Sequence, residues 1–221
     1  MKHVDGWWFP DREQHLIAWM ASPKGRMILN GRPAYQGRKQ TAVLKCFPQG
    51  LKNKVAVDVG AHIGLWTYNL AAWGCCEIHS FEPVAEHRAC FEKNVTAPSV
   101  RLYPYALGHE EGSVKIAFSE TSTGDSWVDG KGDIPLKTLD SFKLKDVAFV
   151  KIDTEGYEEN VLKGGLETIQ ASRPVICVEQ KRQMASKFGL KPQGAVEFLK
   201  QLGYVVREEI SGDYIMVPTC G

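Results

Sequence analysis

Five short apolar runs alternate along the chain with segments in which apolar residues recur at helical spacing. The strand-like runs cover residues 55–59, 77–81, 100–105, 147–152 and 175–179. The helical patterns cover residues 64–73, 84–95 and 156–171. Strands that alternate with helices predict an α/β fold with a doubly wound, mostly parallel sheet.

The C-terminal segment breaks this alternation. Its sequence, "GYVVREEISGDYIMVP", contains two strand-like runs on either side of Ser211-Gly212-Asp213. Two such runs around a short polar turn predict an antiparallel hairpin. We therefore expect the parallel sheet to be closed by one antiparallel hairpin.

The first fifty residues show a different pattern from the remainder. Apolar residues at 16, 17, 19 and 20 predict an amphipathic helix after Pro10, and a second helix is expected from Gln36 to Cys46. We expect residues 1–50 to form an N-terminal helical cap or extension on a main domain that spans residues 51–221.

Composition and charge limit the classes of partner. The 221 residues are 43% apolar and 24% charged, with a net charge of +1. This balance is typical of a globular domain and predicts no general attraction to nucleic acid or to a membrane surface. No run approaches the roughly 20 apolar residues of a membrane span. Acidic residues interrupt the start of the chain, and the six cysteines contain no C-x-x-C pair, so we expect a reduced, cytoplasmic protein.

The loop after the first parallel strand indicates a nucleotide-like ligand. In "VAVDVGAHIGLWTYNLA", a dinucleotide fingerprint aligned on Gly60 would need glycines at positions 62 and 65, but His62 and Leu65 stand there. The missing second glycine is the one that lets the backbone approach a pyrophosphate. A nicotinamide-dependent oxidoreductase is therefore disfavoured.

Two carboxylates near this loop favour a different ligand. Asp58 lies at the end of the first strand and suits a cationic amine, and Glu82 ends the next strand, where a carboxylate can accept the two hydroxyls of a ribose. An amine and a ribose without a phosphate describe S-adenosylmethionine. The alternative is that Asp58 caps the following helix and Glu82 is a solvated strand end.

Six short motifs support that interpretation. They are "VDVGAHIG" (57–64), "FEPV" (81–84), "YALG" (105–108), "TLDSF" (138–142), "VKIDTEGYEENVLKGG" (150–165) and "VICVEQ" (175–180). With these motifs, the chain resembles the FkbM-type S-adenosylmethionine-dependent methyltransferases. The resemblance implies the Rossmann-like class I methyltransferase fold with a seven-stranded sheet. It also implies transfer of a methyl group to a hydroxyl of a sugar or another small molecule.

The resemblance further implies positions for the cofactor. The expected cofactor-binding residues are Asp58, Val59, Gly60, Ala61, His62 and Gly64 for the methionine part, Glu82 and Pro83 for the ribose, and Tyr105, Ala106 and Leu107 for the adenine.

Three carboxylates are the candidate catalytic residues. Asp153 and Glu155 follow the fourth parallel strand and Glu179 ends the fifth, at the edge where open α/β sheets bind ligands. We expect Asp153 to lie nearest the cofactor sulfonium and Glu155 to orient or deprotonate the acceptor hydroxyl, with Glu179 facing the same space. His62 and His109 are alternative bases. The competing interpretation is that Asp153 and Glu155 cap the next helix.

The same three carboxylates offer oxygen ligands of the kind that Mg²⁺ binds. No spacing of histidine and aspartate demands a metal, and we expect none. A non-catalytic cofactor-binding module is the main alternative function, since it would keep Asp58 and Glu82 without needing Asp153 and Glu155.

The acceptor side is expected outside the cofactor motifs. The loop "SETSTGDSWVDGKGD" contains Trp127, and the segment "DGWWFP" near the N-terminus contains Trp8. Exposed tryptophans in polar, glycine-containing surroundings suit stacking on a sugar or flat ring. We predict that Trp127 and Trp8 bind a small-molecule or glycan acceptor. The turn after the fourth strand reads "DTEG" and not the Asn/Asp-Pro-Pro-aromatic turn of amino-group DNA methyltransferases.

Overall fold

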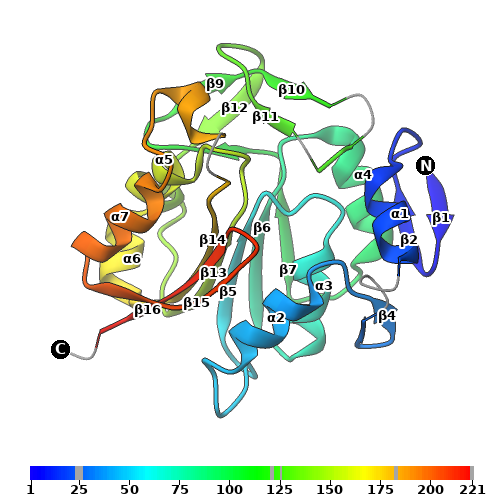
Figure 1. The fold of residues 1–221 in the computed structure, drawn as a ribbon, viewed down its shortest axis with the longest axis horizontal. Helices are drawn as coiled ribbons and strands as arrows, with labels where there is room; N and C mark the ends of the chain where they lie inside the picture. Colours follow the sequence, from blue (N-terminus) through cyan, green and yellow to red (C-terminus); the bar gives the residue numbers. More distant parts are fainter. Residues whose placement is uncertain (23–26, 120–121, 125, 182–183, 220–221) are drawn as a thin grey trace.

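A seven-stranded sheet forms the centre of the computed structural model, which describes residues 1–22, 27–119, 122–124, 126–181 and 184–219. Its strand order is β15-β16-β14-β13-β5-β6-β7 (Figure 1). The strands are β5 (Val55–Val59), β6 (Glu77–Phe81), β7 (Val100–Tyr103), β13 (Val147–Ile152), β14 (Val175–Glu179), β15 (Tyr204–Ile210) and β16 (Asp213–Pro218). The first five run parallel, and β16 pairs antiparallel with both β14 and β15. The predicted fold is confirmed.

Helices cover both faces of this sheet (Figure 1). One face carries α2 (Gly37–Leu44), α3 (Leu65–Ala72) and α4 (Ala85–Asn94), and the other carries α5 (Glu158–Lys163), α6 (Leu166–Ser172) and α7 (Gly194–Gln201). Two short 3₁₀ helices, Leu139–Phe142 and Ala185–Phe188, lie in the connections. The carboxyl ends of the parallel strands therefore meet at one edge between two helical layers.

The N-terminal segment contains hairpins as well as helices. Strands β1 (Lys2–Val4) and β2 (Trp7–Phe9) pair around Asp5 and Gly6, whose φ values of 49° and 83° suit an Asp-Gly turn. Helix α1 (His15–Ala21), strands β3 (Ile28–Leu29) and β4 (Arg32–Pro33), and α2 follow. The expected N-terminal cap or extension therefore contains hairpins beside its two helices, because the aromatic residues at 7–9 alternate across a strand and not around a helix.

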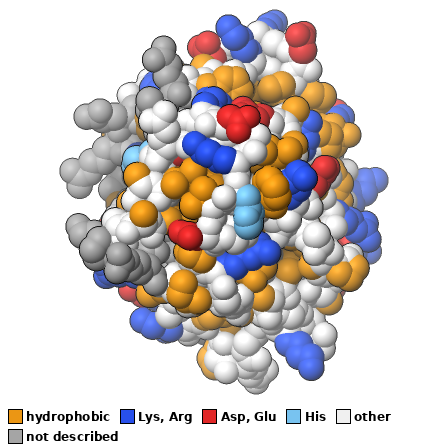
Figure 2. Space-filling view, turned by 90° about the vertical axis from the view of Figure 1, so that its right-hand side faces the viewer, with side chains coloured by type: hydrophobic (Ala, Val, Ile, Leu, Met, Phe, Trp, Pro, Cys, Tyr) orange, Lys and Arg blue, Asp and Glu red, His pale blue; other side chains and the backbone are white. Residues whose placement is uncertain are grey.

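This segment packs on the main domain next to α4. The Asn94 side chain accepts from the Trp8 amide at 2.7 Å and donates to the Trp8 carbonyl at 3.0 Å, which joins β2 to the end of α4. The face that carries this contact shows acidic, basic and apolar side chains interspersed among its described residues (Figure 2). Among those residues, neither sign of charge forms a continuous patch.

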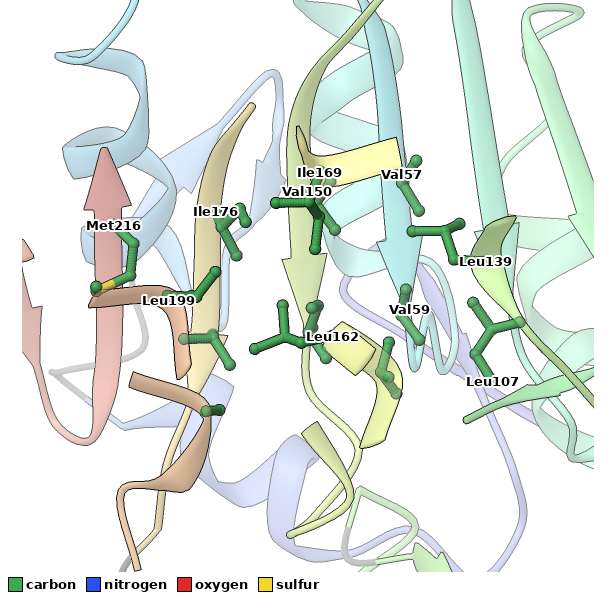
Figure 3. Packing of buried hydrophobic residues seen from close by; sticks show 14 of the residues in the cluster. Val57, Val59, Leu107, Leu139, Val150, Leu162, Ile169, Ile176, Leu199 and Met216 are labelled. Atoms are coloured by element: carbon green, nitrogen blue, oxygen red, sulfur yellow. The ribbon is translucent and has the colours of Figure 1, made fainter. Parts of the chain in front are cut away.

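Strand alternation divides the core into two layers. On β5 and β13, the side chains of Val57, Val59 and Val150 pack toward α5, α6 and α7 with Leu162 and other apolar residues (Figure 3). The intervening positions of these strands face α2 and α3. Since Asp58 and Lys151 are such intervening positions and are register partners, the pairing of β5 with β13 brings them side by side within the sheet.

Two predicted elements are shorter than expected. The helix predicted for residues 156–171 is two helices, because the chain turns at Gly164 and Gly165. A Cβ at Gly164 would lie 1.9 Å from the Gly108 carbonyl oxygen. The strand predicted for residues 100–105 ends at Tyr103, and Pro104, which has no amide to donate, follows it.

Small sheets follow β7 and precede β13. Strand β12 (Ile134–Lys137) pairs with β8 (Ala106–Leu107) and β9 (Gly112–Val114), while β10 (Ile116–Phe118) pairs with β11 (Ser126–Val128). The stretch from Gly112 to Phe118 is therefore divided between two sheets. This region lies above the carboxyl edge of the main sheet in Figure 1.

Within the described part of the chain, every helix is too short or too polar to cross a bilayer. The five cysteines among the described residues are unpaired, and Cys220 lies outside that part.

Candidate active site

A cavity of about 420 Å³ opens at the carboxyl edge of the main sheet. The ends of β5, β6, β13 and β14 supply its floor, and residues from α1, from the start of α2 and from β10 and β11 supply the remaining wall. Open α/β sheets bind ligands in this place, where the strands end and the helices diverge.

Most of the predicted cofactor residues line this cavity. These are Val59, Gly60, Ala61, His62, Glu82, Pro83, Tyr105, Ala106 and Leu107. Asp58 and Gly64 do not line it. The candidate catalytic residues Asp153, Glu155 and Glu179 do, as does Tyr157 in the turn before α5.

Asp58 is directed away from the cavity, which corrects its expected place beside the ligand. The side chain is fully buried, its Oδ2 accepts from the Thr67 hydroxyl at 2.7 Å, and its Oδ1 lies 3.5 Å from Lys151 Nζ. The physical reason is alternation along β5. Its neighbour Val59 reaches the cavity wall, whereas Asp58 faces α3.

Gly64 also has a packing role in place of the expected ligand contact. Its φ is 93°, and a Cβ there would lie 2.6 Å from the Val95 side chain of the segment after α4. Gly60 likewise allows a close approach, because a Cβ there would lie 1.9 Å from the Asp153 carbonyl oxygen. This contact brings the loop after β5 against the turn after β13.

The backbone of the β5 loop is already hydrogen bonded. The amides of Gly60 and Ala61 both donate to the Phe81 carbonyl at 3.0 Å, and the His62 amide donates to Glu82 Oε2 at 2.7 Å. Amides used in this way are not available to cradle a pyrophosphate. The geometry agrees with the missing dinucleotide glycines.

Glu82 is an ionised carboxylate in the cavity wall. Burial opposes its charge, but the neighbouring His87 and the amides of Val84 and His62 lower the pKa of Glu82 below its usual value. The Val84 amide donates at 2.9 Å, and His87 Nδ1 lies 3.2 Å away. A carboxylate fixed in this way can accept hydrogen bonds from ligand hydroxyls.

The three candidate catalytic carboxylates converge. One oxygen from each of Asp153, Glu155 and Glu179 lies within 4.8 Å of the other two. Glu155 and Glu179 are buried, and Asp153 is half-buried. The prediction that these side chains meet at one edge of the sheet is confirmed by the geometry, and their catalytic roles stay a prediction.

Lysines compensate the charge of this cluster. Lys151 Nζ lies 3.6 Å from Asp153 Oδ2, and Lys181 Nζ lies 3.0 Å from Glu155 Oε1 and 3.2 Å from Glu179 Oε2. Sequence reasoning missed Lys151. A lysine in the middle of an otherwise apolar strand was the available signal, because a buried ammonium needs an acidic partner.

The cluster holds its protons unevenly. Burial, together with the charges of Asp153 and Glu155, raises the pKa of Glu179 well above its usual value. Burial also acts on Asp153, but Lys151, Lys181 and Lys39 outweigh it and lower the pKa of that carboxyl. Asp153 is therefore the member that stays ionised, and Glu179 is the member that holds a proton to a higher pH than usual. The expectation that these carboxylates bind no metal stays a prediction.

The backbone amides of the turn after β13 have their own acceptor. Glu158 Oε1 accepts from the amides of Thr154 and Gly156 at 3.1 and 2.8 Å. Glu155 has a left-handed φ of 52°, which is uncommon for this residue type and is often found at functional sites. The capping alternative for Asp153 and Glu155 is weakened, because another carboxylate does that work.

Neither predicted acceptor-binding tryptophan lines the cavity, which corrects both expectations. Trp8 packs against His3, with ring centroids 4.9 Å apart, and lies under Lys93. Trp127 lies between Ser126 and Val128, which both line the cavity, so strand alternation turns its ring away toward Lys187.

Other aromatic residues take that place. Trp19 of α1 and Tyr35 before α2 line the cavity and contact each other edge to face, with ring centroids 4.5 Å apart. Trp66 also lines it but stacks on Phe149 in the core. The amphipathic pattern around Trp19 predicted its helix, but nothing local to that pattern showed which side chain would reach the cavity.

His62 connects the cofactor loop to the N-terminal segment. Its Nε2 lies 2.7 Å from the Thr123 hydroxyl, and the Thr123 amide donates to Glu13 Oε2 at 2.8 Å. Burial lowers the pKa of His62 well below its usual value, so the ring is neutral at pH 7. His109, the other alternative base, does not line the cavity.

The seven-stranded sheet with its antiparallel β15–β16 end and its cavity at the carboxyl edge is the class I methyltransferase fold. Residues 58–206 match the Methyltransferase FkbM domain, and this match covers more than half of the chain. The chain therefore belongs to the FkbM methyltransferase family.

Solved structures show the same architecture at low sequence identity. A precorrin-6y C5,15-methyltransferase from Geobacter metallireducens is 16% identical with a TM-score of 0.52, over 83% of this chain and 88% of that one. A candidate rRNA methylase from Clostridium thermocellum is 15% identical with a TM-score of 0.53, over 88% of this chain and 99% of that one.

A methyltransferase FkbM from Methylobacillus flagellatus is 15% identical with a TM-score of 0.49 over 75% of this chain. This chain spans 43% of the length of that protein. No curated protein sequence matches the chain significantly.

Proposed function

We propose that this methyltransferase uses S-adenosylmethionine to methylate a hydroxyl oxygen of a sugar or another small molecule. The observation that carries the proposal is one cavity in which Glu82, at the end of β6, faces the same space as the acidic cluster at the ends of β13 and β14. Glu82 suits the ribose of the cofactor. The acidic cluster suits the cationic part of the cofactor and the proton that leaves the acceptor hydroxyl.

The residues present fit the cofactor. Glu82 is ionised and would hold the ribose hydroxyls, while Tyr105, Ala106 and Leu107 would lie against the adenine. Asp153, which stays ionised, would hold the cationic amine of the cofactor, which is the role first expected of Asp58. When bound, S-adenosylmethionine supplies an electrophilic methyl group on a positively charged sulfur.

The acidic cluster supplies the proton chemistry. We place the acceptor hydroxyl beside Glu155, whose carboxylate takes the hydroxyl proton as the oxygen gains the methyl group. The Glu155 carboxylate would keep this proton, and the cofactor without its methyl group, S-adenosylhomocysteine, would be the leaving group. Lys181, 3.0 Å from Glu155, holds that carboxylate in place before the transfer.

Apolar and aromatic residues favour a ring-shaped acceptor. Trp19 and Tyr35 face the cavity from the N-terminal segment, and Gln36 and Lys39 add polar groups beside them. Aromatic faces next to hydrogen-bonding groups suit a sugar ring, which has apolar faces and a polar rim. The acceptor would therefore contact α1 and α2 more than the loop that holds Trp127.

Two other functions have specific observations against them. An oxidoreductase that binds a dinucleotide would need free amides in the β5 loop, and Gly60 and Ala61 donate theirs to Phe81. The neighbour from Clostridium thermocellum is described as an rRNA methylase, so an RNA acceptor is the second alternative. Binding RNA would require a basic surface. The net charge is +1, and basic side chains are interspersed with acidic ones on the face in Figure 2.

Binding and turnover test the proposal separately. Calorimetry with S-adenosylhomocysteine and with NAD should show binding of the first alone. Labelled S-adenosylmethionine should then methylate a component of fractionated glycans or small molecules, and should leave total RNA unlabelled. Tight NAD binding without S-adenosylhomocysteine binding would contradict the cofactor. Binding without transfer to any pool would indicate the non-catalytic module, and labelled RNA would contradict the acceptor class.

A further inference from the structure

A chain of buried hydrogen bonds lies next to the acidic cluster but outside the cavity lining. It is formed by Glu158 of α5 and Gln180, the residue after β14, with exposed fractions of 1% and 3%. Glu158 uses one oxygen, Oε1, for the amides of Thr154 and Gly156. These two amides lie on either side of Glu155.

The second half of the chain of hydrogen bonds reaches another helix. Glu158 Oε2 accepts from Gln180 Nε2 at 3.1 Å, and Gln180 Oε1 accepts from the Ala195 amide at 3.0 Å. Ala195 lies in the first turn of α7, where backbone amides lack partners within the helix. The turn after β13, the segment after β14 and the start of α7 are therefore joined through two side chains.

These hydrogen bonds fix the segments that hold the acidic cluster. Glu155 keeps its left-handed backbone between two amides that Glu158 holds, and Gly156, with φ of 107°, packs against the backbone of Met184. Gln180 lies between Glu179 and Lys181 in the sequence, so its side chain fixes the segment that carries both. A strained turn persists only where its surroundings determine it.

We propose that Glu158 and Gln180 act as a positioning pair, which sets the placement of Glu155 relative to Glu179 and Lys181. The inference rests on the proposed function for its effect on methyl transfer. Neither side chain touches the ligand space. Their effect is to hold carboxylates on two different strands in one arrangement.

Donor and acceptor matching makes the pair testable. In Glu158→Gln, the new amide can keep its oxygen toward Thr154 and Gly156, but its NH₂ then faces the NH₂ of Gln180. If Gln180 rotates to relieve this, its NH₂ faces the Ala195 amide instead. A mismatch of two donors thus remains at one end. In Gln180→Glu, two carboxylate oxygens face each other.

The double variant Glu158→Gln/Gln180→Glu restores every match with the same net charge. The amide introduced at position 158 would accept from the turn amides and donate to the carboxylate introduced at position 180, and that carboxylate would accept from the Ala195 amide. The matched control is Glu159→Gln, on the neighbouring residue of α5, whose carboxylate pairs with Lys163 at 2.8 Å. It makes the same change of charge without touching the chain of hydrogen bonds.

The experiment is a double-mutant cycle with two readouts, carried out above the raised pKa of Glu158, which is about 7, so that its carboxylate is ionised. Hydrogen exchange measures protection of the peptide that contains residues 153–157, and single-turnover kinetics measures methyl transfer. We expect Glu158→Gln to lose protection and about a hundredfold in kcat, as a small displacement at a reacting centre can cost, with a smaller loss in S-adenosylhomocysteine affinity. The double variant should recover both protection and kcat, and Glu159→Gln should change neither.

Three outcomes would overturn the positioning pair. These are normal kcat in folded Glu158→Gln, a double variant no faster than the single variants, or recovery of protection without recovery of kcat. If the wild-type protein transfers no methyl group at all, the proposed function fails. The exchange cycle still shows in that case whether the two side chains fix the turn.

Discussion

The two walls of the cavity are built in different ways. The cofactor wall comes from residues at the ends of β5, β6 and β7 or within a few positions after them, at 59–62, 82–83 and 105–107. The acceptor wall comes from α1, the segment before α2 and the strands β10 and β11, which are far apart in the sequence. A wall made of strand ends is encoded in short motifs, whereas a wall assembled from distant segments has no local motif. The carboxylates of the acidic cluster lie where the two walls meet.

The largest effect is expected at that junction. Glu155→Gln removes the proposed base and should lower kcat by about 10²–10⁴-fold, the usual contribution of a general base. S-adenosylhomocysteine binding should persist, because the cofactor wall is intact. Single-turnover kinetics and calorimetry measure the two quantities. Glu110→Gln, on a residue outside the cavity lining, is the control, and near-normal turnover in Glu155→Gln would assign the base to another residue, with Glu179 the first to test.

The buried Glu158 carboxyl, next to the acidic cluster, should make the free energy of unfolding depend on pH. Burial raises the pKa of Glu158 from 4.5 to about 7. Between these values the unfolded chain has released this proton and the folded chain still holds it, so the free energy of unfolding falls as pH rises. At about 1.4 kcal/mol per unit, this difference amounts to about 3 kcal/mol.

Urea unfolding at several pH values tests this dependence. The slope of stability against pH should be more negative for wild type than for Glu158→Gln, in which this group no longer titrates. The comparison of slopes is independent of any constant loss caused by the substitution. Equal slopes between pH 4.5 and 7 would show that Glu158 titrates normally in the folded protein.

Asp58 and Glu82 both lie at a strand end in the sequence, but their substitution should have different effects on cofactor affinity. Glu82→Gln should weaken S-adenosylhomocysteine binding by about 1.5–3 kcal/mol, the contribution of a hydrogen bond to a charged group. Asp58→Asn should leave that affinity nearly unchanged and lower stability, because Asp58 bonds Thr67 and faces Lys151 inside the protein. Calorimetry and thermal unfolding report the two effects, and a loss of affinity in Asp58→Asn would contradict the separation.

The smallest effect is expected on the acceptor wall. Trp19→Ala removes one aromatic contact, worth about 0.5–1.5 kcal/mol, and should raise the acceptor KM by about twofold to tenfold. Trp127→Ala is the matched control, since its ring faces Lys187 and not the cavity. An increased KM in Trp127→Ala with none in Trp19→Ala would reverse the assignment of the acceptor wall.

The strands and the cofactor loop were predictable because their patterns are local. Four predicted strands, at 55–59, 77–81, 147–152 and 175–179, have the same bounds in the structure. The wrong predictions concern the direction in which a side chain points and the contacts between segments far apart in the sequence. Asp58 was expected in the cavity because it ends a strand, but alternation along β5 places Val59 there instead.

The sequence by itself determined the alternation of the main-sheet strands with helices, the final hairpin, the absence of dinucleotide glycines and the positions of three carboxylates at strand ends. These follow from periodicity and from residue chemistry within a few positions of each other. Only the tertiary structure decided that Lys151 and Lys181 neutralise the carboxylates, that Glu158 and Gln180 hold the turn, and that Trp19 reaches the cavity. Such pairings join segments far apart in the chain, and their geometry is set by packing between layers, which no local pattern records.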